Sequence, residues 1–152
     1  MPRSLRALAI DNIDRKIIEL LLVDARTSIK DLAKSVKLSA PSVSERVQRL
    51  QERGVIRRFT VDIDPASLGY DLQALVRIKP LPGKLQVVEK LIQDIPEFSE
   101  CFKVTGNDCF IARLHFYTIS QLDEILDRIA RVAELNTSIV KAQPVRNRLP
   151  PF

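Results

Sequence analysis

The chain has 152 residues, of which 45% are hydrophobic and 28% charged, with a formal net charge of +5. This composition is typical of a soluble globular protein with one large or two small domains, and no stretch approaches the roughly 18 apolar residues of a membrane span. The N-terminal segment lacks the long apolar core of a secretory signal, so we expect a cytoplasmic protein whose two cysteines are free thiols rather than a disulfide.

Metal chemistry has little support in the composition. Cys109 and His115 could share one face of a strand, and Cys101 is the only other cysteine. Three scattered candidates do not form a ligand cluster, and a single strand histidine usually has a structural role. We therefore expect neither a metal site nor a cofactor.

The first predicted element is a helix from about Asp11 to Val23. Asp11 is suited to cap its N-terminus, and Asp14 suits the positive end of the helix dipole. Apolar residues recur at helical spacing on one side, at Ile13, Ile17, Leu20 and Leu21. This helix is expected to form the platform of a three-helix domain that spans residues 1–60.

Two further helices joined by a short turn follow. Ser28 and Asp31 have the spacing of a capping box, which predicts that a helix begins there. Ser39 is the strongest N-cap candidate in the chain, with Pro41 in the first turn of the next helix. That second helix is predicted over residues 40–53 and ends at Gly54. The arrangement is a helix-turn-helix, typical of proteins that insert the second helix into the DNA major groove.

The outward face of the second motif helix carries the candidate DNA contacts. Val43, Val47 and Leu50 form the buried stripe, and polar residues occupy the other positions. The candidates are Ser39, Ser42, Ser44, Glu45, Arg46, Gln48 and Arg49. Hydroxyls near the helix N-terminus, with amide and guanidinium groups further along, can bond to base edges or phosphates. The alternative is an ordinary surface helix with solvated polar residues.

The distribution of charge favours the DNA interpretation. Residues 1–60 contain 13 Lys and Arg against 7 Asp and Glu, whereas residues 61–152 contain 11 against 12. The basic excess therefore lies on the helix-turn-helix half. One half is expected to neutralise phosphates while the other half has a different task.

After Gly54 the apolar residues alternate through residues 55–63, which predicts a short strand or wing. Arg57 and Arg58 lie where the chain leaves the helix and are candidate phosphate contacts, with solvated surface charges as the alternative. Asp64-Pro65 ends this strand. Residues 61–71 are expected to be a linker strand and hinge.

Over residues 72–152 the predicted strands and helices follow one another in a recognisable order. We predict a strand from Leu72, a helix ending before Pro96, two strands joined by a turn at 105–108, a helix capped by Ser120, and a last strand over about 138–145. The order β-α-β-β-α-β is that of a ferredoxin-like domain, with both helices on one face of an antiparallel sheet. The fold class is therefore α+β, with a winged helix-turn-helix domain preceding a ferredoxin-like domain.

The uncovered face of this sheet is expected to be apolar. Alternation places Leu75 and Ile111 on it, and Cys101 and Cys109 are further candidates for the same face. An exposed apolar sheet face usually belongs to an interface. A homodimer formed through it would present two recognition helices to a palindromic site.

Taken together, these segments resemble the Lrp/AsnC family (leucine-responsive regulatory protein / asparagine synthase C regulator) from about residue 11 to 145. The resemblance is carried by IDRKIIELL, DARTSIKDLA, KLSAPSV and GVI in the first half, and by the Thr-Gly turn, a following Phe and TSIV in the second. It implies a transcriptional regulator whose dimers assemble further, to octamers, and bind an amino acid or related small molecule between neighbouring dimers.

The resemblance also suggests effector-binding residues. In the family a Gly-x-x-Asp turn contributes to the pocket, and here the acid falls one position early. The corresponding residues are Gly106, Asn107 and Asp108 in the turn, with Thr137 and Ser138 near the last strand. Asp108 would receive an α-amino group, and backbone N–H groups of the turn would bind the carboxylate. The alternative is a turn with no ligand.

Two other classes share the architecture. A decarboxylase of haem precursors would need more polar and histidine side chains in its pocket than His115 provides, so we expect no enzyme. An architectural DNA-binding protein without an effector would differ from a regulator only in the pocket.

Overall fold

The computed structural model describes residues 10–146 and 149–150, so the N-terminal arm and part of the C-terminal tail lie outside the described residues. The chain divides into two compact units, residues 1–62 and 63–152. Each unit has its own hydrophobic core. No helix of the described residues is both long and apolar enough to cross a membrane.

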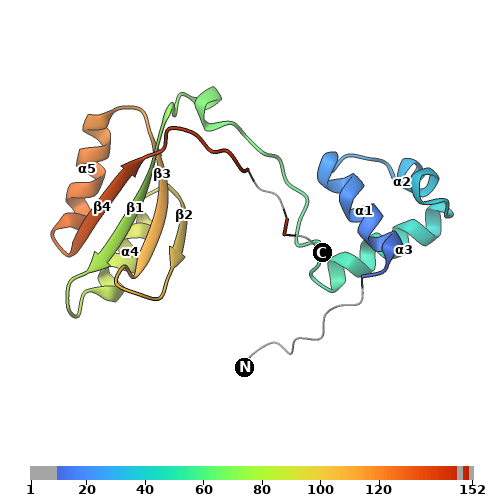
Figure 1. Cartoon of the computed structure of the whole chain (residues 1–152), viewed down its shortest axis with the longest axis horizontal. Helices are drawn as coiled ribbons and strands as arrows, with labels where there is room; N and C mark the ends of the chain where they lie inside the picture. Colours follow the sequence, from blue (N-terminus) through green and yellow to red (C-terminus); the bar gives the residue numbers. More distant parts are fainter. Residues whose placement is uncertain (1–9, 147–148, 151–152) are drawn as a thin grey trace. The chain divides into compact units, whose positions relative to one another are not determined.

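The N-terminal unit consists of three helices, α1 (Asn12–Val23), α2 (Ile29–Val36) and α3 (Ala40–Glu52) (Figure 1). Each begins at the predicted cap. The side chains of Asp11, Ser28 and Ser39 accept hydrogen bonds from backbone N–H groups three residues further on, over 2.7, 3.1 and 3.3 Å. These bonds satisfy N–H groups that have no partner within the helix, and they fix where each helix starts.

The turn between α2 and α3 depends on a left-handed residue. Lys37 has φ 57° and ψ 44°. This conformation is uncommon for a side chain other than glycine, asparagine or aspartate. It allows the N–H of Leu38 to bond the carbonyl of Ala33 over 3.0 Å, which closes α2. The chain can then turn sharply into α3.

The predicted wing is not formed. The N–H groups of Val55 and Ile56 both bond the carbonyl of Leu50, over 2.9 and 3.0 Å, and these two apolar residues pack against the core of the three helices. Residues 57–64 then form no helix or strand, and a short 3-10 helix, η1 (Pro65–Leu68), follows. The alternating residues of 57–63 have no neighbouring strand within the described chain, so the pattern alone could not make a ladder.

The C-terminal unit has the predicted β-α-β-β-α-β order. Its elements are β1 (Leu72–Pro80), α4 (Leu85–Asp94), β2 (Phe98–Lys103), β3 (Phe110–Phe116), α5 (Ile119–Ala130) and β4 (Ala133–Ile139). The sheet has the strand order β2-β3-β1-β4 with every neighbouring pair antiparallel. This topology confirms the ferredoxin-like prediction.

Two boundaries differ from the prediction. The helix α5 is capped by Thr118, which accepts from the N–H of Gln121 over 3.2 Å, so Ser120 lies inside the first turn. The last strand spans Ala133–Ile139 rather than about 138–145, so it begins only two residues after α5 and ends before Val140. Its polar residues weakened the strand pattern, and polar residues are tolerated here because β4 is an edge strand.

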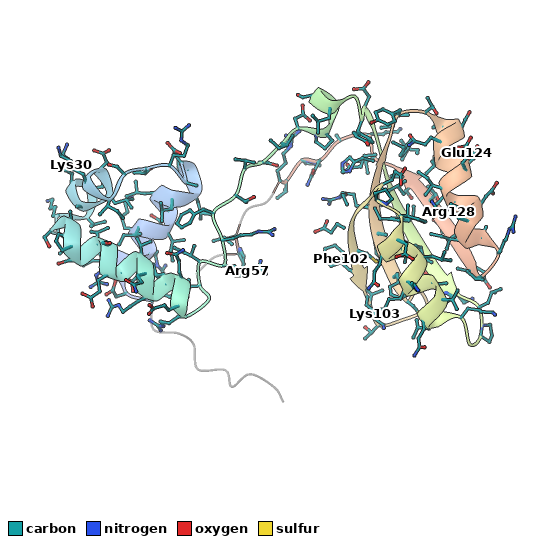
Figure 2. All side chains as sticks on the ribbon, turned by 180° about the vertical axis from the view of Figure 1, so that it is seen from behind. Lys30, Arg57, Phe102, Lys103, Glu124 and Arg128 are labelled. Carbon is teal, nitrogen blue, oxygen red and sulfur yellow. The ribbon has the colours of Figure 1, made fainter. Side chains whose placement is uncertain are left out.

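One face of the sheet is covered and the other is open. Ala74, Val76, Ala112 and Leu114 are fully buried against α4 and α5, while the alternate residues point to the opposite face. In Figure 1 α4 lies behind the sheet, and in Figure 2, seen from the other side, it lies in front. The open face carries Leu75, Arg77 and Gln73 of β1, Ile111, Arg113 and His115 of β3, and Glu100 and Phe102 of β2.

Neither cysteine lies on the open face, contrary to the expectation from simple alternation. A register shift between Phe98 and Glu100 moves Cys101 opposite Ala112, on the helix-covered side of the edge strand. Cys109 precedes β3 and packs against the core. Both are free thiols, and burial raises the pKa of the Cys101 thiol.

Candidate nucleic-acid interface and effector region

The helix α3 presents most of the predicted DNA contacts to solvent. Its buried residues are Val43, Val47 and Leu50, which pack against α1 and α2. Six of the seven candidates on this helix and its cap are exposed, namely Ser39, Ser42, Ser44, Glu45, Gln48 and Arg49. Glu45, Gln48 and Arg49 lie on the side of the helix away from the buried stripe, Ser42 and Ser44 lie on its flanks, and Ser39 is the N-cap.

Arg46 has an intramolecular role instead. Its Nη1 donates to Asp11 Oδ2 over 2.6 Å and to Asp14 Oδ1 over 2.7 Å, and its side chain is only 20% exposed. Asp14 is the only charged residue among the buried side chains of the described chain. Both carboxylates hold the guanidinium of Arg46 against α1, so Arg46 is the one candidate on this helix that forms ion pairs with described residues of its own unit.

The electrostatics of this cluster are mutually favourable. Hydrogen bonding to Asp11, and then to Asp14, raises the pKa of Arg46. The backbone N–H of Asp14, followed by the Arg46 guanidinium, lowers the pKa of Asp11. Sequence reasoning noted both acids as features of α1 but could not pair them with a residue more than 30 positions away. The signal was the position of Arg46 on the flank of the buried stripe.

Several other side chains on α3 bond to one another. The hydroxyls of Ser39 and Ser42 are 2.8 Å apart, and Gln48 Nε2 donates to Glu52 Oε1 over 2.8 Å. The side chains of Ser44, Glu45 and Arg49 make no hydrogen bond or ion pair with a described residue. These three groups are consequently available to a ligand without breaking an existing bond.

Cations surround this helix in the same unit. Lys30, Lys34 and Lys37 are exposed on or beside α2, and Lys34 is 3.8 Å from Asp31. Arg57 and Arg58 are exposed after α3, and Figure 2 labels Lys30 and Arg57. Exposed Lys and Arg side chains on long flexible stems can reach phosphates on either side of a groove.

The turn between β2 and β3 contains the first group of candidate effector residues. The N–H of Val104 bonds the carbonyl of Cys109 over 2.9 Å, which closes the turn. Gly106 has φ 110°, a conformation that favours glycine strongly. Asn107 is exposed and Asp108 is half-buried, and the Asp108 carboxylate makes no hydrogen bond or ion pair with a described residue.

The second group, Thr137 and Ser138, lies elsewhere on the sheet. These residues are within β4, opposite Val76 and Leu75, and both are exposed. Strands β1 and β3 separate them from the turn by roughly 10 Å, and the turn begins roughly 7 Å further along the sheet. Adjacent strand positions also send their side chains to opposite faces. One chain therefore does not bring the two predicted groups together.

A cavity of about 230 Å³ lies in the C-terminal unit and contains none of these residues. Its lining residues are Ile63, Pro65, Leu68, Tyr70, Pro96, Glu97, Ser99 and His115. Burial, followed by the charge of Arg113, lowers the pKa of His115, whose Nε2 lies 3.0 Å from Gln73 Nε2. Sequence reasoning missed this cavity because its walls come from three separate segments. Among described residues no group of three or more His, Cys, Asp and Glu could hold a metal ion.

These features define a class of protein: a helix-turn-helix DNA-binding transcriptional regulator with a separate ferredoxin-like ligand-binding domain. Residues 10–51 match the AsnC-type helix-turn-helix domain, and residues 73–150 match the Lrp/AsnC ligand binding domain. The chain belongs to the Lrp/AsnC family of transcriptional regulators.

Curated relatives support the same assignment. The HTH-type transcriptional regulator FL11 of Pyrococcus furiosus is 32% identical over 123 residues, which is 81% of this chain and 82% of that protein. The HTH-type transcriptional regulator LrpA of Mycobacterium tuberculosis is 32% identical over 130 residues, covering 85% and 87%. These relatives are named regulators, so the expectation that the chain is no enzyme is confirmed.

Solved structures show the same fold over nearly the whole chain. LrpC of B. subtilis superposes with a TM-score of 0.83 at 26% identity, covering 90% of this chain and 98% of that one. The feast or famine regulatory protein from M. tuberculosis, complexed with L-methionine, gives a TM-score of 0.84 at 28% identity, covering 93% and 99%. The second structure is of a protein with an amino acid bound.

Replacing Arg46 with Ala tests its structural role. The change leaves the mostly buried Asp14 carboxylate without its cation, and we expect the free energy of unfolding of the N-terminal unit to fall by about 3–5 kcal/mol. Urea unfolding of the full chain, followed by circular dichroism at neutral pH, measures it. Arg49→Ala, three positions away and exposed, is the matched control and should change stability by less than about 0.5 kcal/mol. Equal effects of the two changes would contradict the assignment.

Proposed function

We propose that this chain regulates transcription by binding a palindromic operator as a homodimer and that an amino acid or related small molecule, bound between dimers, alters its assembly. The observation that carries the proposal is the exposed polar face of α3 within the unit that holds the basic excess of the chain. A recognition helix needs such a face, and phosphates need the surrounding cations.

In the proposed complex α3 enters the major groove. Ser39, Ser42 and Ser44 are near its N-terminal end, where the recognition helix of such motifs meets base edges. Glu45, Gln48 and Arg49 follow along the same exposed side. Arg57 and Arg58 contact phosphates beside the groove. The phosphate contacts supply affinity, and the contacts of α3 supply sequence preference.

Dimerisation is proposed through the open face of the sheet. Leu75 is 39% exposed at its centre and Phe102 is 54% exposed on β2, both large apolar side chains in contact with water. A second copy that covers them would remove this apolar area from solvent. A two-fold interface buries the same residues on both copies.

The extended segment of residues 57–63 supports the same assembly. Its backbone makes no hydrogen bond to the backbone of a described residue, and its apolar side chains Phe59, Val61 and Ile63 are 46%, 77% and 55% exposed. An unpaired segment with this alternation is suited to pair with the same segment of a second copy. Such pairing would provide the strand that the sequence pattern predicts.

The effector is proposed to be an amino acid. Asp108 offers an unpaired, half-buried carboxylate to an α-amino group, and the turn around Gly106 and Asn107 offers backbone N–H groups to a carboxylate. Thr137 and Ser138 would reach the ligand from another copy, because the two groups are separated within one chain. A related regulator is complexed with L-methionine, which supports this ligand class.

A second candidate is an architectural DNA-binding protein that forms the same dimers and responds to no effector. The separation of Thr137 and Ser138 from the turn favours it, since the ligand site is incomplete in one chain. This alternative shares the proposed DNA binding and dimerisation and lacks only the effector.

Changing Gln48 and Arg49 together to Ala should weaken operator binding by about ten-fold or more, because the variant loses hydrogen bonds to bases or phosphates. Gel-shift titration measures the affinity, and sedimentation checks that the dimer is intact. Lys90→Ala, an exposed cation on α4, is the control that should leave affinity unchanged. Wild-type affinity should fall steeply as salt rises. A flat salt dependence, or a double variant that binds normally, would contradict the proposed face.

Changing Leu75 to Asp should dissociate the dimer, since it places a charge in the proposed apolar interface. Val87→Asp is matched to it, because Val87 is 45% exposed on α4 and Leu75 is 39% exposed. Analytical ultracentrifugation measures the oligomeric state of both variants. If Leu75→Asp stays dimeric, or if Val87→Asp dissociates to the same extent, the open face is not the interface.

Changing Asp108 to Asn should abolish stabilisation by the amino acid that raises the melting temperature of the wild type. A thermal-shift screen of the twenty amino acids identifies that ligand, and Asp94→Asn, an exposed acid at the end of α4, should respond as the wild type does. A variant that retains the shift would remove Asp108 from the site. A wild type that responds to none of them would favour the architectural alternative.

A further inference from the structure

Glu45 occupies the centre of the outward face of α3. At 3.6 residues per turn its side chain points roughly 170° away from the centre of the stripe formed by Val43, Val47 and Leu50. It lies in the first half of the helix, one residue before the middle position, and is exposed. In the proposed complex this position is among the closest to the bases.

The charge of Glu45 is not compensated within the described chain. Neither Arg49, four residues further on, nor any other described cation lies within 4 Å of its carboxylate. The other acid at the centre of this face, Glu52, accepts a hydrogen bond from Gln48, and the cation Arg46 is held by Asp11 and Asp14. Glu45 therefore meets DNA as a free carboxylate.

A free carboxylate is a poor group to place against DNA without a donor. Phosphates give the duplex one negative charge per roughly 1.7 Å of axis, and a desolvated carboxylate that finds no donor is strongly unfavourable. The donors on the floor of the major groove are the N4 amino group of cytosine and the N6 amino group of adenine. Adenine presents the N7 acceptor beside its amino group, which repels a carboxylate, whereas cytosine presents no such acceptor.

We infer that Glu45 is a specificity-determining residue that accepts a hydrogen bond from the N4 amino group of a cytosine in each operator half-site. The inference rests on the proposed insertion of α3 into the major groove and adds one required base pair to it. Glu45 selects mainly against other bases, because a half-site without this cytosine leaves the carboxylate desolvated and unpaired.

Selection from a random duplex library tests the inference with the full-length protein. The wild type should enrich a half-site with one invariant cytosine, and replacing that C·G pair by T·A should weaken binding by at least about five-fold. Glu45→Ala should lose most of this discrimination while binding an unrelated duplex more tightly. Glu45→Gln should shift the preference at that position towards adenine, which glutamine can bond through N6 and N7.

Glu52→Gln is the matched control, because it removes the same charge from the same face near the end of the helix. This variant should enrich the same half-site as the wild type, including the invariant cytosine. Far-UV circular dichroism checks that each variant is folded. An enriched site without an invariant cytosine, or variants of Glu45 that tighten binding to every duplex equally and keep the same preference, would overturn the inference. A wild type that enriches no sequence would instead overturn the proposed function.

Discussion

The orientation of α3, the proposed recognition helix, depends on the ion pairs of Arg46 with Asp11 and Asp14. Arg46 lies on the flank of α3, between its buried stripe and its exposed face, and its two partners lie at the start of α1. The positive end of the α1 dipole stabilises the same acids. A guanidinium shared by two carboxylates fixes distance and direction together, which apolar packing does less specifically. The exposed face is thereby set relative to the rest of the unit.

The sheet of the C-terminal unit imposes a similar division. In the order β2-β3-β1-β4 both helices pack on one face, so alternate residues of β1 and β3 are fully buried and their neighbours are not. The open face mixes Leu75, Phe102 and Ile111 with an Arg113–Glu100 pair 3.2 Å apart. Charged pairs of this kind in an interface favour one relative alignment of the two partners over others. Folding of this unit thus leaves large apolar side chains of the open face in contact with water.

Local signals were sufficient to predict most of the fold. Asp11, Ser28 and Ser39 cap their helices as predicted, because capping depends on neighbouring residues. One error is local, since Thr118 rather than Ser120 caps α5, and the other main errors involve distant partners. The residues around Phe59 alternate but lack a strand to pair with, Cys101 changes face through a bulge, and Arg46 meets acids that are distant in sequence. For the candidate DNA contacts, the helical spacing of the apolar residues was enough to predict which side chains of α3 are exposed. For the candidate effector residues, the strand order was needed to show that Thr137 and Ser138 lie apart from the turn at Gly106–Asp108.

That division has a thermodynamic consequence for the proposed effector. If the turn at Gly106–Asp108 and the pair Thr137–Ser138 contribute to one site, different copies must supply them, and the complete site exists only in the assembled protein. A ligand that binds only the assembled form must stabilise it by the same free energy that assembly adds to ligand binding. Regulation then requires no conformational path from the sheet to α3. A change in the number of recognition helices that one assembly holds together is enough to change DNA affinity. Two linked helices bind two half-sites far more tightly than two separate ones.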